Sequence, residues 1–555
     1  DKLHAELGLP RDANKRAVLA GWNAIREDRT GSTWLAASVV FEAIAGAAPE
    51  VADPMRAMKI GVRAGVFRVR KDGGETWVAI GENARAEQRI ADAIGRLIRS
   101  ATAWPMDLPE SEQPGDGLPS SHQAGELAAA TASPIGCLTG GPGTGKSYTI
   151  SHLLRLLCDR VGQEKIAVVA PTGKASSRST EYLRDQGLNL EARTIHRLLG
   201  WAGQGTFAFH SRNQLPQRVI VVDESSMIDT QLMASLLDAC ADGTQILFVG
   251  DPFQLAPVGH GAPLRDLLAA GVPNGDLKEV RRNAGSIVRG CAAIKAGDRP
   301  TLADRFDLDA DDPINLRLLE SHDALDSVEQ VLLAMSRFDP VWQTQILCAV
   351  NEKSDLSRAA VNERFQKLLN PEGRRVPGIP FACGDKVICT SNSTLSAVEF
   401  GAGDETDAGR YQPTGGESFV ANGDIGKVKA ISSTGIILEF GERLVRVPKS
   451  KPKAKADEGS EGDIVSGAMG DFELGYGITG HKSQGSQWPC VIVLADKSGG
   501  SVADRNWWYT TISRAEKACL IVGDRSAFEQ QVRRETLTRR KTFLTELLRE
   551  SLPTA

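Results

Sequence analysis

Hydrophobic residues along this chain follow two alternating patterns. Short apolar runs, which are typical of buried strands, occupy residues 166–170, 219–222, 246–249, 344–350, 491–494 and 519–522. The segments between them have the spacing of amphipathic helices, as at Ile150, Leu153, Leu154 and Leu157. Strands that alternate with helices form parallel sheets, and the long interval between the third and fourth runs predicts two α/β domains.

Residues 1–115 show a different pattern. Helical spacing is found at 33–45, 54–64 and 87–98, and two alternating runs, 66–70 and 77–80, are separated by Lys-Asp-Gly-Gly. Helices followed by a basic hairpin resemble a winged helix. Such a domain binds duplex DNA in some proteins and docks or packs against proteins in others, and the sequence leaves both readings open. A Pro- and Gly-rich linker, 106–120, follows.

Two insertions and the C-terminus complete the pattern. Residues 199–215, with Gly-Gln-Gly near their centre, predict a short hairpin. Residues 381–472 contain short strand patterns broken by Gly and Asn, and we expect 401–416 to form a loop. Residues 533–549 predict one basic amphipathic helix that serves packing.

One stretch has the spacing of a phosphate-binding loop. Residues 137–150 read C-L-T-G-G-P-G-T-G-K-S-Y-T-I, which contains G-x-x-x-x-G-K-[ST] between a strand and a helix. The glycines allow backbone N–H groups to turn towards phosphate oxygens, and the helix N-terminus adds partial positive charge. We expect Lys146 to reach the β- and γ-phosphates and Ser147 to hold Mg²⁺.

Two other loops follow buried strands and carry polar side chains. Asp223 and Glu224 come directly after 219–222. Asp223 is placed to hold Mg²⁺ through water, and Glu224 to orient and deprotonate an attacking water. The stretch 249–255 repeats the arrangement on another strand, which makes Gln254 a candidate sensor of the γ-phosphate.

Composition narrows the class of protein. The chain has 555 residues, of which 41% are hydrophobic and 24% charged, and this indicates several globular domains. No apolar run is long enough to span a membrane, and no signal peptide is visible. The nine cysteines lack C-x-x-C spacing and predict a reducing, cytoplasmic environment. The net charge of −5 excludes a uniformly basic coat, so nucleic acid would have to bind in a local groove.

The motifs in their order resemble a superfamily 1 helicase of the RecD-like, 5′-to-3′ group, which includes the exodeoxyribonuclease V alpha subunit, over about residues 118–523. The stretches that carry the resemblance are 121–124 (Q motif), 170–175 (Ia), 194–200 (Ib), 280–283 (IV), 478–485 (V) and 509–515 (VI). Ser225, Asn283 and Gly480 depart from the residues usual in the group. None of these departures removes a charged catalytic group.

The resemblance implies ATP as substrate, Mg²⁺ as cofactor and roles for individual residues. The implied catalytic residues are Lys146, Asp223, Glu224, Gln254, Arg282 and Arg514, with the two arginines reaching across from the second α/β domain. The implied metal ligands are Ser147 and Asp223. The implied nucleotide-binding residues are Gln123, Gly141, Pro142, Gly143, Thr144, Gly145, Lys146, Ser147, Tyr148 and Gly485.

The resemblance also implies a single-strand channel across both sheets. Its candidate residues are Pro171, Thr172, Thr194, His196, Phe207, Phe209, Thr479 and His481. Without the motif context, His196 and His481 would be read as structural histidines. The hairpin at 199–215 takes the place of a strand-separating pin, although an ordinary surface hairpin would have the same sequence pattern.

We therefore predict an α/β protein with two RecA-like parallel-sheet domains, an inserted hairpin, an SH3-like barrel and an N-terminal helical or winged-helix domain. The expected boundaries are 1–115 for the N-terminal domain, 116–275 for the first RecA-like domain, 276–380 with 473–555 for the second, and 381–472 for the barrel.

The function that this resemblance implies is ATP-driven, 5′-to-3′ unwinding of DNA. The expected partners are single-stranded DNA and a duplex fork, with proteins as possible partners of the N-terminal domain. One alternative is an RNA helicase, because a channel that binds backbone and bases does not by itself distinguish DNA from RNA. The other alternative is a DNA-binding regulatory ATPase without unwinding activity.

Overall fold

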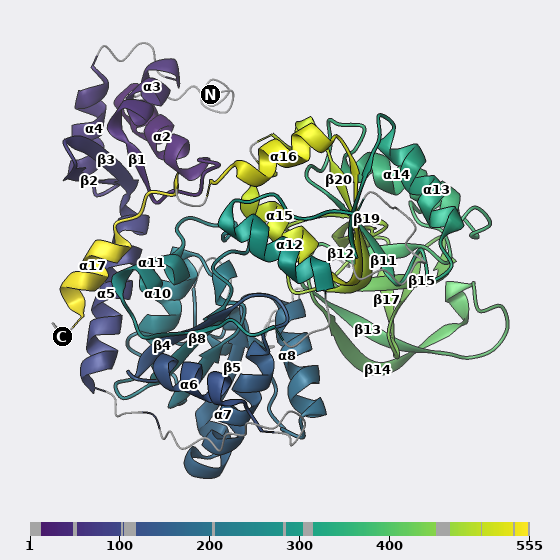
Figure 1. The fold of residues 1–555 in the computed structure, drawn as a ribbon, viewed down its shortest axis with the longest axis horizontal. Coiled ribbons are helices and arrows are strands. Elements are labelled where there is room, and N and C mark those ends of the chain that lie inside the picture. Colours follow the sequence, from purple (N-terminus) through teal and green to yellow (C-terminus); the bar gives the residue numbers. More distant parts are fainter. Residues whose placement is uncertain are drawn as a thin grey trace, which may run out of the picture.

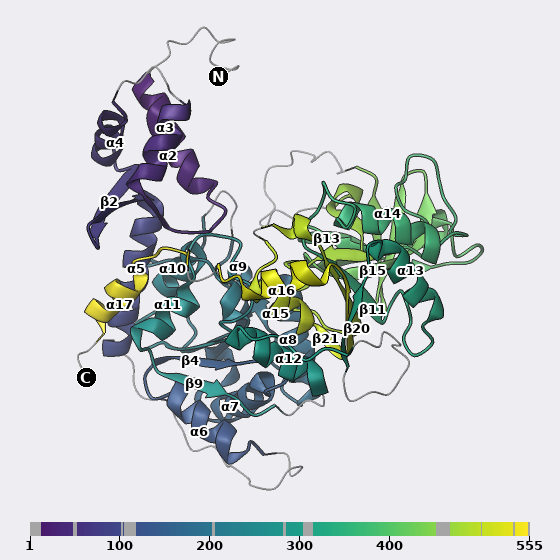
Figure 2. The same cartoon turned by 45° about the horizontal axis from the view of Figure 1, so that its top comes forward.

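The computed structural model describes residues 13–47, 53–100, 104, 118–201, 206–280, 285–303, 315–450, 467–500, 502–536 and 539–552. Figures 1 and 2 show two α/β bodies side by side, a β-rich lobe beyond the second, and an N-terminal domain that projects from the first. Within the described ranges no helix has the length and apolar character that crossing a membrane requires.

The N-terminal domain consists of three helices and a small antiparallel sheet. Its elements, in chain order, are α2 (Ala13–Arg26), β1 (Trp34–Ala36), α3 (Ala37–Ala47), α4 (Pro54–Arg63), β2 (Phe67–Asp72) and β3 (Glu75–Ile80). The sheet order is β1-β3-β2. The helix predicted at 33–45 was wrong at its start, because residues 34–36 pair with β3 instead. The predicted hairpin is confirmed.

A helix of 20 residues, α5 (Gly81–Ser100), joins this domain to the rest of the chain. It is longer than the predicted 87–98 segment, and it packs against α10 (Thr230–Ala239) and α17 (Leu544–Ser551). Its buried residues, such as Ile90, Ile94 and Leu97, belong to the same hydrophobic core as the first parallel sheet. The helix therefore forms part of the first α/β body as well as linking to it.

The first parallel sheet has the order β6-β5-β7-β8-β4-β9. Its strands are β4 (Ile135–Gly140), β5 (Ile166–Ala170), β6 (Arg193–Thr194), β7 (Val219–Val222), β8 (Gln245–Gly250) and β9 (Asn274–Leu277). Helices α6 (Ser121–Ala130), α7 (Lys146–Val161), α8 (Gly173–Asp185), α9 (Ile195–Leu198), α10 and α11 (Pro263–Ala270) connect or cover them. The predicted boundary at 275 lies inside β9, so this sheet extends to Leu277.

The second parallel sheet has the order β10-β21-β20-β11-β19. Its strands are β10 (Leu316–Glu320), β11 (Thr344–Cys348), β19 (Gly477–Thr479), β20 (Trp488–Ala495) and β21 (Ala515–Gly523). The helices of this body are α12 (Gly285–Ala296), α13 (Ala324–Ala334), α14 (Arg358–Leu369), α15 (Arg505–Ile512) and α16 (Arg525–Arg533). The prediction of two parallel-sheet α/β domains is confirmed.

The β-rich lobe is a seven-stranded antiparallel sheet with the order β14-β13-β17-β16-β15-β12-β18. Its strands are β12 (Lys386–Cys389), β13 (Ser393–Phe400), β14 (Tyr411–Val420), β15 (Ile425–Ser432), β16 (Gly435–Phe440), β17 (Arg443–Pro448) and β18 (Phe472–Leu474). The loop predicted at 401–416 was wrong at its end. Residues 411–416 belong to β14, where ladder hydrogen bonds to β13 hold even a polar, Gly-containing segment in a strand.

The C-terminal segment departs furthest from its prediction. The single helix expected at 533–549 was wrong: α16 ends at Arg533 and α17 begins at Leu544. Between them the chain leaves the second α/β body and returns to the first (Figure 1, yellow), where α17 packs on α5 and α11. Leu544 and Leu548 are fully buried there, which accounts for a helix so far from its own domain.

Candidate nucleotide and nucleic-acid site

The phosphate-binding loop joins β4 to α7 at the carboxyl edge of the first sheet. Gly143 and Gly145 have φ angles of +77° and +85°, which side chains other than glycine rarely adopt. Gly145 is the N-cap of α7 and carries no side chain to cap it, so the first amides of the helix are free to bind an anion. The local sequence therefore forms the cradle that its pattern predicts.

A cavity of about 420 Å³ opens above this loop, and it accommodates a phosphate chain. The Nζ atom of Lys146 lies within it and donates to the carbonyl oxygens of Gly140 and Gly141, at 2.6 and 3.1 Å. The sequence-predicted residues that line the cavity are Gly141, Pro142, Gly143, Thr144, Gly145, Lys146, Ser147, Tyr148, Asp223, Glu224, Gln254, Gly485 and Arg514.

The two carboxylates follow β7 at the same edge of the sheet. Asp223 accepts hydrogen bonds from Ser179 Oγ at 2.8 Å and from the Glu224 amide at 2.9 Å. Burial, reinforced by the Glu224 carboxylate, raises the pKa of Asp223. Burial destabilises the charged form of this carboxylate, and a bound divalent cation would stabilise it. Asp223 and the Ser147 hydroxyl therefore fit Mg²⁺. Glu224 has a φ of +50°, a strained conformation of the kind that clusters at active sites.

The loop after β8 contacts the second α/β body. Gln254 is 6% exposed, lines the cavity, and its Oε1 atom has no hydrogen-bond partner in the described part of the chain. Behind it, Tyr509 of α15 donates its hydroxyl to Asp251 at 2.7 Å, and the Leu255 amide donates to Thr510 Oγ1 at 2.9 Å. Helix α15 thus holds the loop that contains Gln254.

Arg514, just beyond α15, brings a second positive charge to the cavity. It is 3% exposed, and its guanidinium donates to the carbonyl oxygen of Thr510 and to Ser513 Oγ at 3.0 and 2.9 Å. These contacts fix the side chain in place across the cleft from Lys146. The other predicted arginine, Arg282, lies outside the described residues.

Gln123 lies beneath the loop rather than on the cavity wall. Its Oε1 accepts from the Ser120 amide at the start of α6, and its Nε2 donor is buried without a partner among the described residues. A Cβ at Gly145 would come within 2.6 Å of that Nε2 atom, so glycine is required for the amide to approach the loop. An unsatisfied donor in this place suits a hydrogen-bond acceptor on a base.

The predicted nucleic-acid residues lie near the carboxyl edges of the two sheets. Thr172 follows β5, Thr194 ends β6 and Thr479 ends β19. The Thr172 and Thr194 hydroxyls cap α8 and α9, while Pro171 precedes that first cap. Burial, with the nearby Arg540 guanidinium, lowers the pKa of His481, which keeps its ring neutral. The resemblance implied a channel across both sheets, and these three threonines lie at the carboxyl ends of β5 and β6 in the first sheet and of β19 in the second.

The hairpin is present as bridges rather than as full strands. Trp201 pairs with Phe207, and His210 with Asn213. Phe207 and Phe209 are only partly exposed because they pack against the core of the first sheet. Trp201, which our sequence analysis missed, is 48% exposed, and its ring centroid lies 5.5 Å from His196 and 5.1 Å from Phe207. The signal available was an aromatic residue directly after motif Ib.

Helix α8 supplies cavity residues that the sequence analysis also missed. Arg178, Ser179 and Tyr182 line the cavity. Arg178 donates to the Gly485 carbonyl oxygen at 3.3 Å and to Gln487 Oε1 at 2.6 Å, so it links the first sheet's helix to motif V. Helical spacing from Lys174 of motif Ia places these side chains one to two turns further along α8, which was the only available signal.

Comparisons with known proteins assign the chain to a family. An AAA domain model matches residues 123–260, and a UvrD-like helicase C-terminal domain model matches residues 474–522. The RecBCD enzyme subunit RecD of Mycobacterium tuberculosis is 30% identical over 483 residues, which cover 81% of this chain and 76% of that protein. The chain belongs to the RecD family.

The chain is also similar to a second curated relative and to a solved structure. The ATP-dependent RecD2 DNA helicase of Deinococcus radiodurans is 28% identical over 478 residues, covering 85% of this chain and 58% of that protein. Among solved structures, the Pif1 helicase from Bacteroides in complex with ADP-AlF3 and ssDNA matches with a TM-score of 0.42 and 18% identity, over 73% of this chain and 91% of that one. The two family models match different bodies of this chain, the AAA domain model the first and the UvrD-like model the second.

Proposed function

We propose that this RecD-family chain is an ATP-dependent DNA helicase that translocates 5′ to 3′ on single-stranded DNA and unwinds duplex ahead of it. The observation that carries the proposal is the cavity itself. Its loop and carboxylates come from the first α/β body, and Arg514 and Gly485 come from the second. A nucleotide bound between two bodies couples its hydrolysis to their relative movement, which a motor requires.

The cavity residues divide the chemistry among them. Lys146 neutralises charge on the β- and γ-phosphates, and Arg514 does the same from the opposite side as the γ-phosphoryl group leaves. Glu224 orients a water in line with that group and takes its proton. Ser147 and Asp223 would hold Mg²⁺, which would supply further charge neutralisation. Gln123 accounts for recognition of the base, and Gln254 for sensing of the γ-phosphate.

The contacts of α15 support a coupling between ATP hydrolysis in the cavity and movement of the DNA channel residues. Tyr509 and Thr510 hold the Gln254 loop from the second body, so a change at the γ-phosphate alters the contact between the bodies. The candidate channel residues Thr172, Thr194 and Thr479 lie on the edges that this movement shifts. Hydroxyls and capped helix N-termini bind phosphate without regard to sequence, as translocation along any strand requires.

The same proposal includes a fold for the N-terminal domain and for the β-rich lobe. The order of helices and strands in residues 13–80, with the sheet order β1-β3-β2, supports a winged helix. The register shifts in the β13–β14 and β15–β16 pairs support an SH3-like barrel, because such irregularities bend a sheet. We place the end of the N-terminal domain at Ile80 and the end of the first parallel sheet at Leu277, and we assign both α5 and α17 to the first RecA-like domain because they pack in its core.

Duplexes with a single-stranded tail at either end test the proposal. We expect ATP-dependent unwinding of the duplex with a 5′ tail and little of the duplex with a 3′ tail, because a motor that moves 5′ to 3′ reaches the junction only from the former. Single-stranded DNA should stimulate ATP hydrolysis more than RNA of the same sequence. Preference for the 3′ tail would contradict the polarity, and hydrolysis without unwinding of either duplex would favour a regulatory ATPase.

The hairpin provides a separate prediction. Replacing residues 203–209 by a two-residue turn should reduce unwinding at least tenfold while sparing ATP hydrolysis on single-stranded DNA. The reason is that the cavity contains no residue of 203–209 and the channel residues Thr172, Thr194 and Thr479 lie outside the hairpin. Hydrolysis therefore does not need the hairpin, whereas strand separation needs a hairpin against which the fork is driven. Unwinding and hydrolysis are measured on the same preparation. Undiminished unwinding would show that this is a surface hairpin, and loss of both activities with a lower melting temperature would show that it supports the fold.

A further inference from the structure

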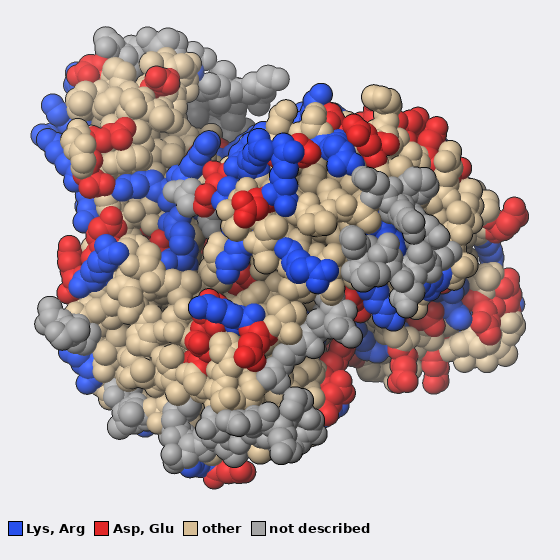
Figure 3. Space-filling view, in the orientation of Figure 1, with Lys and Arg blue, Asp and Glu red and all other residues tan. Residues whose placement is uncertain are grey.

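One face of the N-terminal domain concentrates positive charge that the site described above does not use. Residues 54–71 contain six Lys and Arg residues and no Asp or Glu, in a chain with 65 basic and 70 acidic residues. This segment forms α4 and β2. Figure 3 shows Lys and Arg side chains along the edge of the N-terminal domain where these two elements lie.

Packing of α4 directs its basic residues outward. Its buried face contains Ala57, Met58 and Gly61, and a Cβ at Gly61 would overlap the Phe67 ring of β2, so the helix lies directly on the strand. Arg56, Lys59 and Arg63 occupy positions i, i+3 and i+7 on the opposite face, and all three are exposed. The helix begins sharply, with the Asp53 side chain accepting from the Met55 amide and proline in the first turn.

The hairpin extends this face on one side only. Side chains alternate along β2, so Lys71 shares the side on which Phe67 meets α4. Arg70 lies on the other side, with its guanidinium 4.3 Å from the centroid of the Phe543 ring. We call Arg56, Lys59, Arg63 and Lys71 the α4 face. In the part of the chain that the structure describes, none of these four residues forms an ion pair.

We propose that the α4 face binds the phosphate backbone of duplex DNA. Four exposed basic side chains on a helix and an adjacent hairpin attract phosphate oxygens, and the major groove admits an α-helix. The α4 face contains no aromatic side chain, so it offers single-stranded bases no stacking surface, whereas phosphates need only charge. The inference rests on the proposed function for the presence of duplex, which a helicase meets at a fork.

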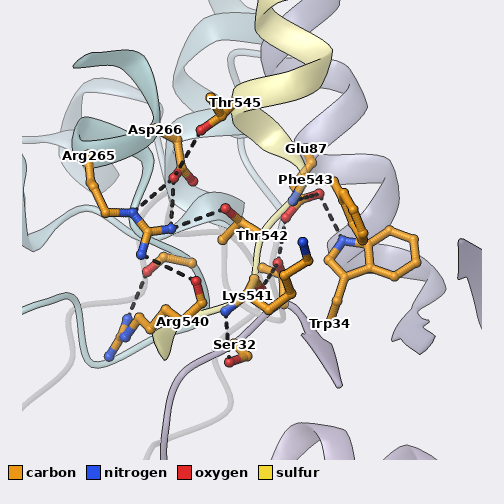
Figure 4. Close-up of polar contacts among 12 residues, drawn as sticks. Ser32, Trp34, Glu87, Arg265, Asp266, Arg540, Lys541, Thr542, Phe543 and Thr545 are labelled. Carbon is orange, nitrogen blue, oxygen red and sulfur yellow. Dashed lines mark hydrogen bonds and ion pairs between the residues drawn. The ribbon is translucent and has the colours of Figure 1, made fainter. Parts of the chain in front are cut away.

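The N-terminal domain is held firmly against the first α/β body. Figure 4 shows the returning C-terminal segment between them. The Lys541 carbonyl oxygen accepts hydrogen bonds from the Thr33 and Trp34 amides at 3.1 and 3.3 Å. The Phe543 ring packs edge-on against the Trp34 ring, with 5.1 Å between the ring centroids. Both Trp34 Nε1 and the Phe543 amide donate to Glu87 of α5, at 2.9 and 3.3 Å.

The same segment also reaches the loop that follows Gln254. Arg540 donates to the carbonyl oxygens of Pro257, Gly259 and Gly261, at 2.8, 3.1 and 2.7 Å. The side chain of His260 in that loop contacts the carbonyl oxygens of Ser32 and Arg26. The α4 face is therefore fixed relative to the nucleotide cleft, and duplex bound there is held at a constant position beside the motor.

The test measures binding of the full chain to a blunt, labelled DNA duplex without nucleotide, by fluorescence anisotropy over a range of salt concentrations. The variant combines Arg56→Gln, Lys59→Gln and Arg63→Gln, which keep helix propensity and remove three charges. We expect duplex affinity about tenfold weaker at low salt. The slope of log K against log salt should be shallower by about 2.7, or about 0.9 for each of the three phosphates that the variant no longer neutralises.

A matched control removes three charges from the surface of the second α/β body through Arg299→Gln, Lys367→Gln and Lys497→Gln. These side chains are exposed, and each forms only a surface ion pair. The control should leave the salt slope unchanged. Equal slopes for the α4 variant and the wild type, with the melting temperature unchanged, would overturn the proposal and leave an acidic protein surface as the partner of this face.

The measurement also separates this proposal from the proposed function. Hydrolysis of ATP stimulated by single-stranded DNA should be the same in the α4 variant and the wild type, because the face lies outside the cavity. If the wild type shows no such stimulation while the α4 variant still loses duplex affinity, the helicase assignment fails and the duplex site stands. If stimulation is normal and duplex affinity is unchanged in the variant, the duplex site fails and the helicase assignment stands.

Discussion

Lys146→Ala is expected to lower the rate of ATP hydrolysis on single-stranded DNA by at least about 10²- to 10³-fold, comparable to the loss of one preorganised donor at a developing charge. The ammonium group lies inside the phosphate loop, bonded to the carbonyl oxygens of Gly140 and Gly141. Its removal takes away one of the positive charges that would offset the negative charge on the transferring phosphoryl group. Steady-state hydrolysis measures the change.

The fold should survive this substitution. Both hydrogen bonds that the Lys146 ammonium donates are to its own loop, so no distant element depends on them. Lys367→Ala, on the exposed surface of α14, removes the same charge and serves as the control. Normal DNA-stimulated hydrolysis by the Lys146→Ala protein would remove the basis of the nucleotide-site assignment, whereas a large fall in melting temperature would show that the lysine supports the fold.

The sequence predicted best those elements whose signal is local. The strands β5, β7 and β8 are continuous apolar runs that are buried along their whole length, because a parallel sheet is covered on both faces. The phosphate loop was equally predictable, since its motif places the glycines, the lysine and the serine within eight consecutive residues. The strands β6 and β9 escaped notice because β6 has only two residues and β9 reads N-G-D-L, which contains a single apolar residue.

Contacts between distant residues were beyond the reach of sequence reasoning. The Tyr509–Asp251 hydrogen bond joins residues 258 positions apart, and the Phe543–Glu87 hydrogen bond joins residues 456 apart. Neither tyrosine nor aspartate at these positions carries a local signal of its partner. The return of the C-terminal segment was missed for the same reason: its amphipathic pattern predicts a buried face without saying which domain covers it.

Buried charges illustrate the limit most clearly. Lys386 begins β12 and would be expected on a solvated face, yet it is 1% exposed and donates to the carbonyl oxygens of Val341 and Thr344. Burial lowers the pKa of Lys386 to about 7. Burial likewise raises the pKa of Glu87 to about 7. Both groups lie where separate elements meet, so only the tertiary structure reveals that they are desolvated.

The Glu224→Gln protein is expected to bind ATP as the wild type does, while its rate of ATP hydrolysis falls about 10²- to 10⁴-fold, which is the usual contribution of a general base. Glutamine has the same shape as glutamate but accepts no proton at neutral pH. The proposed metal ligands Ser147 and Asp223 are untouched, and so is the Glu224 amide that donates to Asp223. Single-turnover hydrolysis and retention of labelled ATP on the protein are measured together.

The strained backbone at Glu224 makes this variant more informative than a deletion of the side chain. At a φ of +50° any residue other than glycine bears a cost of about 1–3 kcal/mol, so glutamine keeps the strain and changes only the proton chemistry. Glu164→Gln, on an exposed turn away from the cavity, is the control. A turnover within a few-fold of wild type would show that another group takes the proton. Loss of ATP binding together with hydrolysis would show instead that the carboxylate positions the metal.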